Sequence, residues 1–314
     1  MLGIHFHVDL SKMIKLNYDE KIVKMENILK NWKRRFLTPI GKIVIVKTLI
    51  VSLFNHLFIS LPNPPDTILN SIKSSILSFI WDGHCKIKFP TIVKDYSEGG
   101  LKMINLDAFI PALKLTWLQK ILSFRGNWIE ITKLYFDTYK LLNCSYHYAL
   151  NIANRISNPF GVDVLNSFSL YCGKLEVNTD EILYYPLFYN PNILIGNKSF
   201  FFKSWFLAGI HCIGDIFKNG TFISCDDLNK MYNLNINFIH YTGVTRAIDT
   251  FLKKCRISCP TLQIIKPFLP PLFQLVLKQE SGAKRLYTIL NKNNEQPTVK
   301  QKWCTKLNTI INEN

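Results

Sequence analysis

The sequence predicts a mainly α-helical protein: a helical bundle with a small β-hairpin, followed by a second, mostly helical region. Apolar residues recur at helical spacing over residues 18–35, 39–60 and 65–81, which indicates three consecutive helices. A Glu98-Gly99-Gly100 turn between two short runs of strand-forming residues indicates the hairpin, near residues 91–104. Hydrophobic residues make up 48% of the 314, enough to bury a sizeable core.

The first expected helix, over residues 18–35, is amphipathic. One face carries the apolar residues Ile22, Met25, Leu29, Trp32 and Phe36. The opposite face carries Lys24, Asn31 and Arg35, with Arg34 beside them. This pattern predicts a helix that packs on a core with one face and exposes a basic face.

The second expected helix begins at Thr38-Pro39, because a hydroxyl caps free N–H groups and the fixed φ of proline suits a first turn. Residues 39–60 are apolar nearly all round, which predicts burial on most sides. The most apolar stretch, from Thr48 to Leu61, has 14 residues, whereas a helix that spans a membrane needs roughly 20. We therefore expect a core helix and no membrane partner.

The third expected helix, over residues 65–81, carries isoleucines and a leucine on one stripe and ends at Asp82-Gly83. Residues 91–96 and 101–104 are expected to form the two strands of the hairpin. A further helix is expected to run from Asn105 or Asp107 to about Leu122.

Four regions are expected along the chain. They are a helical bundle with its hairpin (1–125), an irregular, aromatic-rich linking region (126–185), a region of helices separated by glycine turns (186–290) and a polar, frayed tail (291–314).

The chain is strongly basic, with a formal net charge of +16. Residues 1–125 hold 18 Lys and Arg against 9 Asp and Glu, whereas residues 126–260 hold 12 against 10. Nucleic acid is the commonest partner of such an excess, which indicates that the N-terminal part contacts a polyanion. Surface lysines that keep an apolar chain soluble explain the same composition.

The eight cysteines are scattered without the rhythm of a disulfide framework, and no signal peptide precedes them. These features favour a reducing compartment. We expect an intracellular protein, in the nucleus or the cytoplasm, that is not secreted.

No pattern of catalytic residues stands out, so we expect neither an enzyme nor a cofactor or metal site. Asp226-Asp227 resembles the paired carboxylates that hold two metal ions, but Ser224 before the pair predicts a helix cap with acidic residues in the first turn. Cys255 and Cys259 lie close in sequence, yet no His or Cys pair follows at short range to complete the four ligands of zinc. We interpret these thiols as structural.

Four cations gather near the joint between the first two expected helices: Lys24, Arg34, Arg35 and Lys42. Side chains in such a cluster can contact phosphates without reading bases. A solvated basic face fits the pattern alone equally well.

Several short sequence motifs follow one another along the chain in a characteristic order. In the first 125 residues they are Leu2-Gly3-Ile4, Trp32, Arg35, Leu37, Thr38, Gly41, Lys42, Leu61-Pro62-x-Pro64, Phe79-Ile80-Trp81-x-Gly83, Gly99-Gly100-Leu101, Asp107 and Trp117. Later ones are Tyr189-Asn190, Trp205, Gly209-Ile210, Asp215 and Gly220. In this order they resemble the region after the polymerase active site in LINE-type (non-LTR) retrotransposon reverse transcriptases, the later ones resembling the connector of aquatic-animal members.

The resemblance implies the thumb and connector of such a polymerase, without its catalytic palm. The thumb of this family holds the template–primer duplex by its backbone, which carries over to the four clustered cations as phosphate contacts. Leu2 and Gly3 match the turn of the primer grip, where the family usually has an aromatic residue at the position of Met1. Trp32, Trp81 and Trp117 are expected to pack in the core.

The metal-binding aspartates of the family would lie upstream of Met1, so the resemblance implies no reverse transcription by this chain alone. The expected function is non-catalytic, sequence-independent binding of a nucleic-acid duplex, either RNA/DNA or DNA. The alternative is a basic helical protein-interaction module with no nucleic-acid role.

Overall fold

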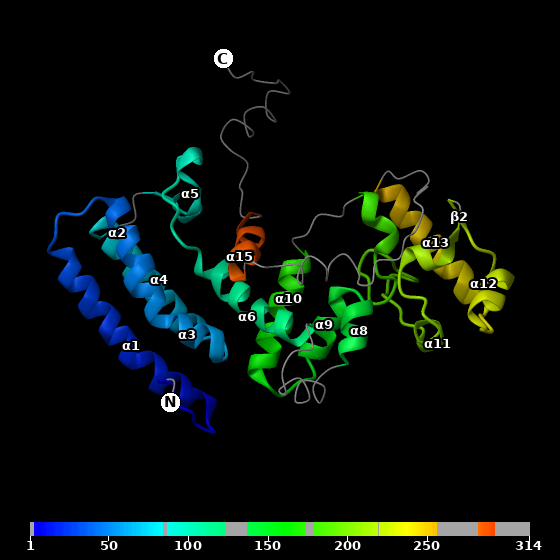
Figure 1. Ribbon diagram of the computed structural model, residues 1–314, viewed down its shortest axis with the longest axis horizontal. Helices are drawn as coiled ribbons and strands as arrows, with labels where there is room; N and C mark the ends of the chain where they lie inside the picture. Colours follow the sequence, from blue (N-terminus) through cyan, green and yellow to red (C-terminus); the bar gives the residue numbers. More distant parts are fainter. Residues whose placement is uncertain are drawn as a thin grey trace, which may run out of the picture. The chain divides into compact units, whose positions relative to one another are not determined.

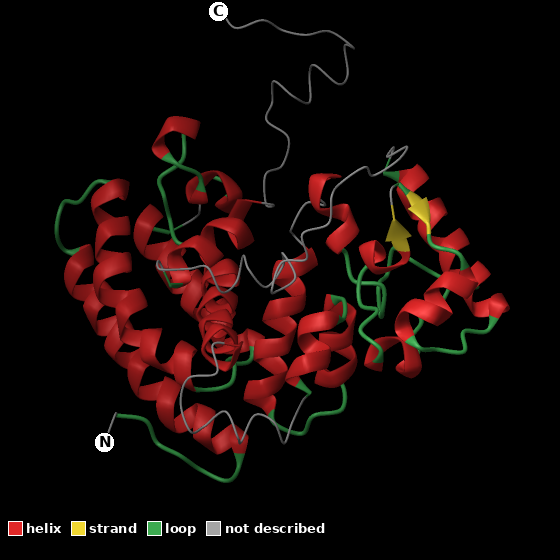
Figure 2. Cartoon of the chain, turned by 45° about the vertical axis from the view of Figure 1, so that its right-hand side comes forward, coloured by secondary structure: helices red, strands yellow, loops and turns green. Residues whose placement is uncertain are grey.

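The computed structural model describes residues 3–83, 87–122, 137–173, 179–218, 220–255 and 282–292. Over these residues the chain is mainly helical with one small antiparallel sheet, which confirms the predicted fold class (Figures 1 and 2). The chain divides into two compact units. Unit 1 comprises the residues up to Lys114 and those from Tyr287 onward, and unit 2 runs from Leu115 to Leu286.

The helices predicted for the N-terminal part are present in unit 1. Its elements are α1 (Leu10–Lys33), α2 (Pro39–Ile45), the π-helical segment η1 (Val46–Val51), α3 (Ser52–Ser60), α4 (Asp66–Trp81), α5 (Phe89–Val93), the 3-10 turn η2 (Tyr96–Glu98), the first half of α6 (Leu106–Leu122) and the end of α15 (Ala283–Lys292). The first helix begins at Leu10 rather than at Tyr18, because Asp9 caps it: its Oδ1 accepts from the Ser11 N–H at 2.9 Å.

Helix α1 packs on α3 and α4 through its apolar stripe (Figure 1). Tyr18 is fully buried, and its ring lies 6.2 Å from that of Phe54 and 6.4 Å from that of Phe58, both on α3. Met25 and Leu29 continue the buried stripe along α1. This contact fixes which face of α1 remains exposed.

The helix predicted over residues 39–60 is present as α2, η1 and α3 in succession, but its burial is less complete than expected. Ile40 and Val44, one turn apart, are about half exposed. The whole helix has 22 residues, and its most apolar window has a mean hydropathy of 1.9 and is 39% buried. It is long and apolar enough to cross a membrane by length and composition only, a test that core helices of soluble proteins also pass.

The hairpin predicted near residues 91–104 is absent, and the one two-stranded sheet of the described residues lies in unit 2. Helix α5 begins at Phe89 in place of the first strand, and the fixed φ of Pro90 suits its first turn. The chain still folds back on itself: the N–H groups of Leu101 and Met103 both donate to the Ile92 carbonyl, at 3.1 and 3.0 Å. The turn was predicted correctly and the strands were not.

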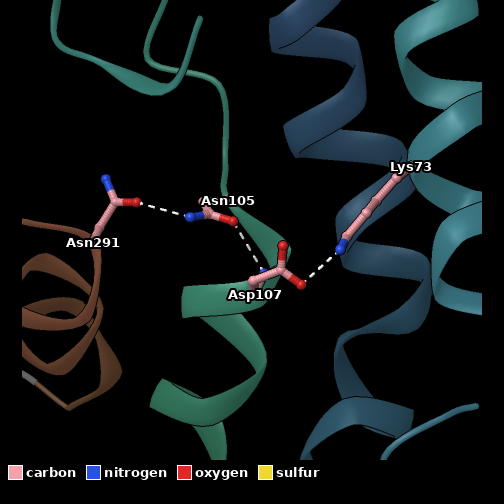
Figure 3. A network of polar contacts seen from close by, with 4 residues as sticks. All are labelled: Lys73, Asn105, Asp107 and Asn291. Atoms are coloured by element: carbon pink, nitrogen blue, oxygen red, sulfur yellow. Dashed lines mark hydrogen bonds and ion pairs between the residues drawn. The ribbon is translucent and has the colours of Figure 1, made fainter. Parts of the chain in front are cut away.

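The start of α6 is tied to two other elements of unit 1 by a polar network (Figure 3). Asn105 is buried; its Nδ2 donates to Asn291 Oδ1 of α15 at 3.2 Å, and its Oδ1 accepts from the Asp107 N–H at 3.1 Å. Asp107 in turn pairs with Lys73 of α4 at 2.6 Å. The last turns of α15 therefore belong with the N-terminal helices.

Unit 2 is helical in the region expected to be irregular. Its elements are the second half of α6, α8 (Thr138–Asn143), α9 (Tyr146–Ala153), α10 (Pro159–Gly173), the 3-10 segment η3 (Thr179–Tyr184), α11 (Lys203–Leu207), the 3-10 turn η4 (Ile213–Ile216), β1 (Phe217–Lys218), β2 (Thr221–Phe222), α12 (Cys225–Tyr232), α13 (Phe238–Lys254) and the start of α15. Conversely, residues 186–202, expected within a helical region, are irregular.

The irregular segment of unit 2 is held by its backbone and by an aromatic core. The Leu187 N–H donates to the His211 carbonyl at 2.9 Å, and the Tyr189 N–H to the Phe200 carbonyl at 3.1 Å. Phe188 is fully buried, edge-on to Phe200 with 6.0 Å between the ring centroids. Tertiary packing thus takes the place of a helical pattern here.

Replacing Gly100 with Ala should destabilise unit 1. A Cβ at this position would lie 2.1 Å from the carbonyl oxygen of Lys94, a backbone atom that already accepts from the Lys102 N–H at 2.8 Å and cannot move aside freely. We expect the free energy of unfolding to fall by about 2 kcal/mol or more, measured by urea denaturation.

Gly41→Ala is the control for this substitution. Gly41 lies in α2, and an added Cβ would meet no atom closer than 3.6 Å. The free energy of unfolding of the Gly41→Ala variant should therefore stay level or rise. Equal effects of the two substitutions would contradict the steric account of Gly100.

Candidate nucleic-acid interface

The C-terminal end of α1 opens a long stretch without negative side chains. Residues 27–65 contain no Asp or Glu and six Lys and Arg. The cations of this stretch therefore have no carboxylate neighbours in sequence to neutralise them. Cations at the end of a helix also interact favourably with the helix dipole, so α1 suits them in its own right.

Three of the four cations predicted to contact phosphates are exposed on unit 1. Lys24 lies on the surface of α1, Arg34 is its C-cap residue and Arg35 follows directly. The guanidinium carbon of Arg35 lies 4.3 Å from the centroid of the Trp32 ring, a cation–π geometry that orients the side chain and leaves its N–H groups available at the rim of the ring.

The prediction that Lys42 contacts phosphate is corrected by the structure, because its ammonium group is buried and already paired. The residue is 4% exposed, its Nζ lies 2.6 Å from Asp82 Oδ2, and the ammonium also lies 5.6 Å from the ring centroid of Phe79. The sequence pattern placed Lys42 near Arg34 and Arg35 but could not show that its side chain points inward. It joins α2 to the end of α4 instead.

The two residues predicted to form a primer-grip-like turn are only partly described. Leu2 lies outside the described residues, and Gly3 has a φ of +66°, which suits a turn that favours glycine. The segment after it is tied to α1, because the His5 N–H donates to Asn17 Oδ1 at 2.9 Å and Asn17 Nδ2 donates back to the His5 carbonyl at 2.7 Å. A grip on a primer stays a prediction.

The other motif residues make local structural contacts. The Thr38 hydroxyl caps α2 by accepting from the Gly41 N–H at 3.2 Å. Trp32, Trp81 and Trp117 are all half-buried, and Trp117 lies edge-on to Phe160 with 5.6 Å between the ring centroids.

Two further lysines near the predicted cations were missed by sequence reasoning. Lys30 and Lys33 of α1 border a groove that α4 closes from the other side. The acid-free stretch could have drawn attention to both, since they fall within it. The opposite wall, which carries three serines, becomes evident only when α1 and α4 are packed together.

Two partly buried groups of unit 1 are disfavoured in their charged form. Burial, together with the ammonium of Lys102, lowers the pKa of Lys47 in η1. Burial, together with Lys21, lowers the pKa of His56 in α3. In each case a neighbouring lysine adds to the larger effect of burial.

The carboxylate pair of α12 lies in the first turn of a helix capped by Ser224, as its sequence context predicts. The Ser224 hydroxyl accepts from the Asp227 N–H at 3.1 Å and donates to Asp227 Oδ2 at 2.7 Å. No cluster of three His, Cys, Asp or Glu residues that could hold a metal ion occurs within the described residues, and Cys259 lies outside them. Among the buried thiols, burial raises the pKa of Cys144 to about 12.

No family model matches this chain, and no curated protein matches it.

Replacing Asp82 with Asn should destabilise unit 1. The change leaves the Lys42 ammonium buried without its counter-charge, whereas Asn tolerates the left-handed backbone at this position, where φ is +54°. The Asp82 side chain is 58% exposed, so water can partly replace it. We therefore expect the free energy of unfolding, measured by urea denaturation, to fall by about 1–3 kcal/mol.

Asp95→Asn serves as the control in the same unit. Asp95 pairs with Lys102 at 2.9 Å, but both side chains are about half exposed, so its loss should shift the unfolding midpoint less. A midpoint unchanged in the Asp82 variant would show that Lys42 does not depend on this partner.

Proposed function

We propose that unit 1 binds the phosphate backbone of a nucleic-acid duplex without reading its sequence, as a thumb-like part of a LINE-type reverse transcriptase. The proposal assigns binding and no chemistry of its own to the chain. The observation that carries it is the group of exposed cations at the end of α1, Arg34 and Arg35 foremost, in a stretch without carboxylates.

The character of these side chains favours backbone contacts over base recognition. Lysine and arginine on an open helix surface bind phosphates by charge, and such contacts fix position without reading sequence. Trp32, which lies next to Arg34 and Arg35, is half-buried and has Arg35 over its ring, so this face offers no free platform for stacking a base.

The resemblance supports the proposal independently of the charge. Several residues of the ordered motifs make contacts that hold unit 1 together: Thr38 with Gly41, Trp32 with Arg35, and Lys42 with Asp82, which occupies the unspecified position of its motif. These contacts position α1, α2 and α4, on which the exposed cations lie. A role on nucleic acid also implies an intracellular location.

A second candidate function is a protein-interaction module. Phe36 is fully exposed between α1 and α2, and Ile40 and Val44 are about half exposed on α2. Exposed apolar side chains close in sequence to the cations suit a protein partner. This candidate predicts no binding of duplex at low salt.

Duplex binding should weaken steeply with salt, because each phosphate contact releases counterions. We expect Arg34→Gln combined with Arg35→Gln to lower affinity for a random duplex and to reduce the slope of log K against log salt concentration by about two, roughly one for each lost contact. Fluorescence anisotropy between low and moderate salt measures both quantities.

The control removes two charges elsewhere. Lys203→Gln combined with Lys230→Gln changes two exposed lysines of unit 2 and should leave the slope as in the wild type. Equal slopes for both double variants would mean that net charge alone drives binding, and an affinity insensitive to salt would rule out the proposed backbone contacts.

A further inference from the structure

A groove of about 350 Å³ runs between α1 and α4 in unit 1. Glu26, Leu29, Lys30 and Lys33 line it from α1, and Ser74, Ser75, Ser78 and Phe79 line it from α4. Leu29 and Phe79 are buried and form its floor, and the polar side chains form its walls. Its volume is at the low end of the range for ligand sites, large enough for a backbone phosphodiester group with its water.

The two lysines are positioned to act on one ligand. Lys30 and Lys33 are three residues apart on α1, so their side chains lie on the same face of the helix. Within the described residues neither forms an ion pair, unlike Lys42 and Lys73, whose ammonium groups are held by Asp82 and Asp107. Their charge is therefore available to a ligand in the groove.

The three serines of α4 supply hydrogen-bond donors on the facing wall. A serine within a helix often donates to the carbonyl four residues earlier, as Ser52 does to Thr48 at 2.5 Å. The side-chain hydroxyls of Ser74, Ser75 and Ser78 make no hydrogen bond within the part of the chain that the structure describes. Hydroxyl donors and ammonium groups that face each other across a groove suit a ligand rich in acceptor oxygens.

We propose that this α1–α4 groove seats a phosphodiester group of the nucleic-acid backbone. Lys30 and Lys33 supply the charge, and the serine hydroxyls donate to the phosphate oxygens. The inference rests on the proposed function and adds a defined seat to it, separate from Arg34 and Arg35. Glu26 at the groove repels the same phosphate and limits its affinity.

Three variants separate the roles of these side chains in binding to a 20-base-pair random duplex. Lys30→Gln with Lys33→Gln should lower affinity on the order of tenfold at low salt and reduce the salt slope by about two. Ser74→Ala with Ser75→Ala and Ser78→Ala should lower affinity several-fold and leave the slope unchanged, because no charge is removed. Glu26→Gln should raise affinity.

The opposite sign expected for Glu26→Gln guards against misfolding as an explanation, since a damaged protein does not bind more tightly. If the lysine variant lowers the slope but the serine variant binds like the wild type, the charges act from a distance and the phosphate is not seated in the groove. Poly-glutamate that displaces the duplex at equal charge concentration would also overturn the inference, in favour of an acidic polypeptide.

Failure of this inference is distinguishable from failure of the proposed function. A wild-type chain that binds no duplex at low salt rejects both. A wild-type chain that binds, weakened by Arg34→Gln with Arg35→Gln but unaffected by the lysine, serine and glutamate variants, keeps the function and rejects the groove.

Discussion

The arrangement of unit 1 depends on the packing of α1 against α3 and α4 through one apolar stripe. Tyr18 lies against Phe54 and Phe58, and Met25 and Leu29 extend the contact toward the end of the helix. Because side chains of a helix point in fixed directions, burial of this stripe decides which cations are exposed. It also brings the lysines of α1 opposite the serines of α4 and so creates the groove.

The motif residues and the exposed cations have separate roles. Trp32, Arg35, Thr38, Gly41 and Lys42 belong to the motif; the first four make contacts within or next to their own helices, and Lys42 pairs with Asp82 at the end of α4. Lys30, Lys33 and Arg34 lie between or beside motif positions and have only their exposure in common. The motif therefore explains the scaffold and one of the proposed binding residues, Arg35, whereas the other proposed binding residues are not specified by it.

Several helix boundaries were predictable from local chemistry, although the Asp9 cap that starts α1 was missed, and burial was not predictable. The caps at Thr38, Asp82 and Ser224 were evident in the sequence because their geometry involves only neighbouring residues. The inward orientation of Lys42 depends on an aspartate 40 residues away, and the helix α5 depends on Pro90 overriding β-branched neighbours. The groove was not predictable, because it requires two helices that are separate in the sequence to meet.

The most direct test of the account is chemical acetylation of lysines, quantified by mass spectrometry with and without a bound duplex. The account predicts that the duplex protects Lys30 and Lys33, that Lys203 in unit 2 reacts equally in both states, and that Lys42 reacts slowly in both because it is buried. Protection of Lys203 as strong as that of Lys30 and Lys33, or no protection of either groove lysine in a bound complex, would contradict it.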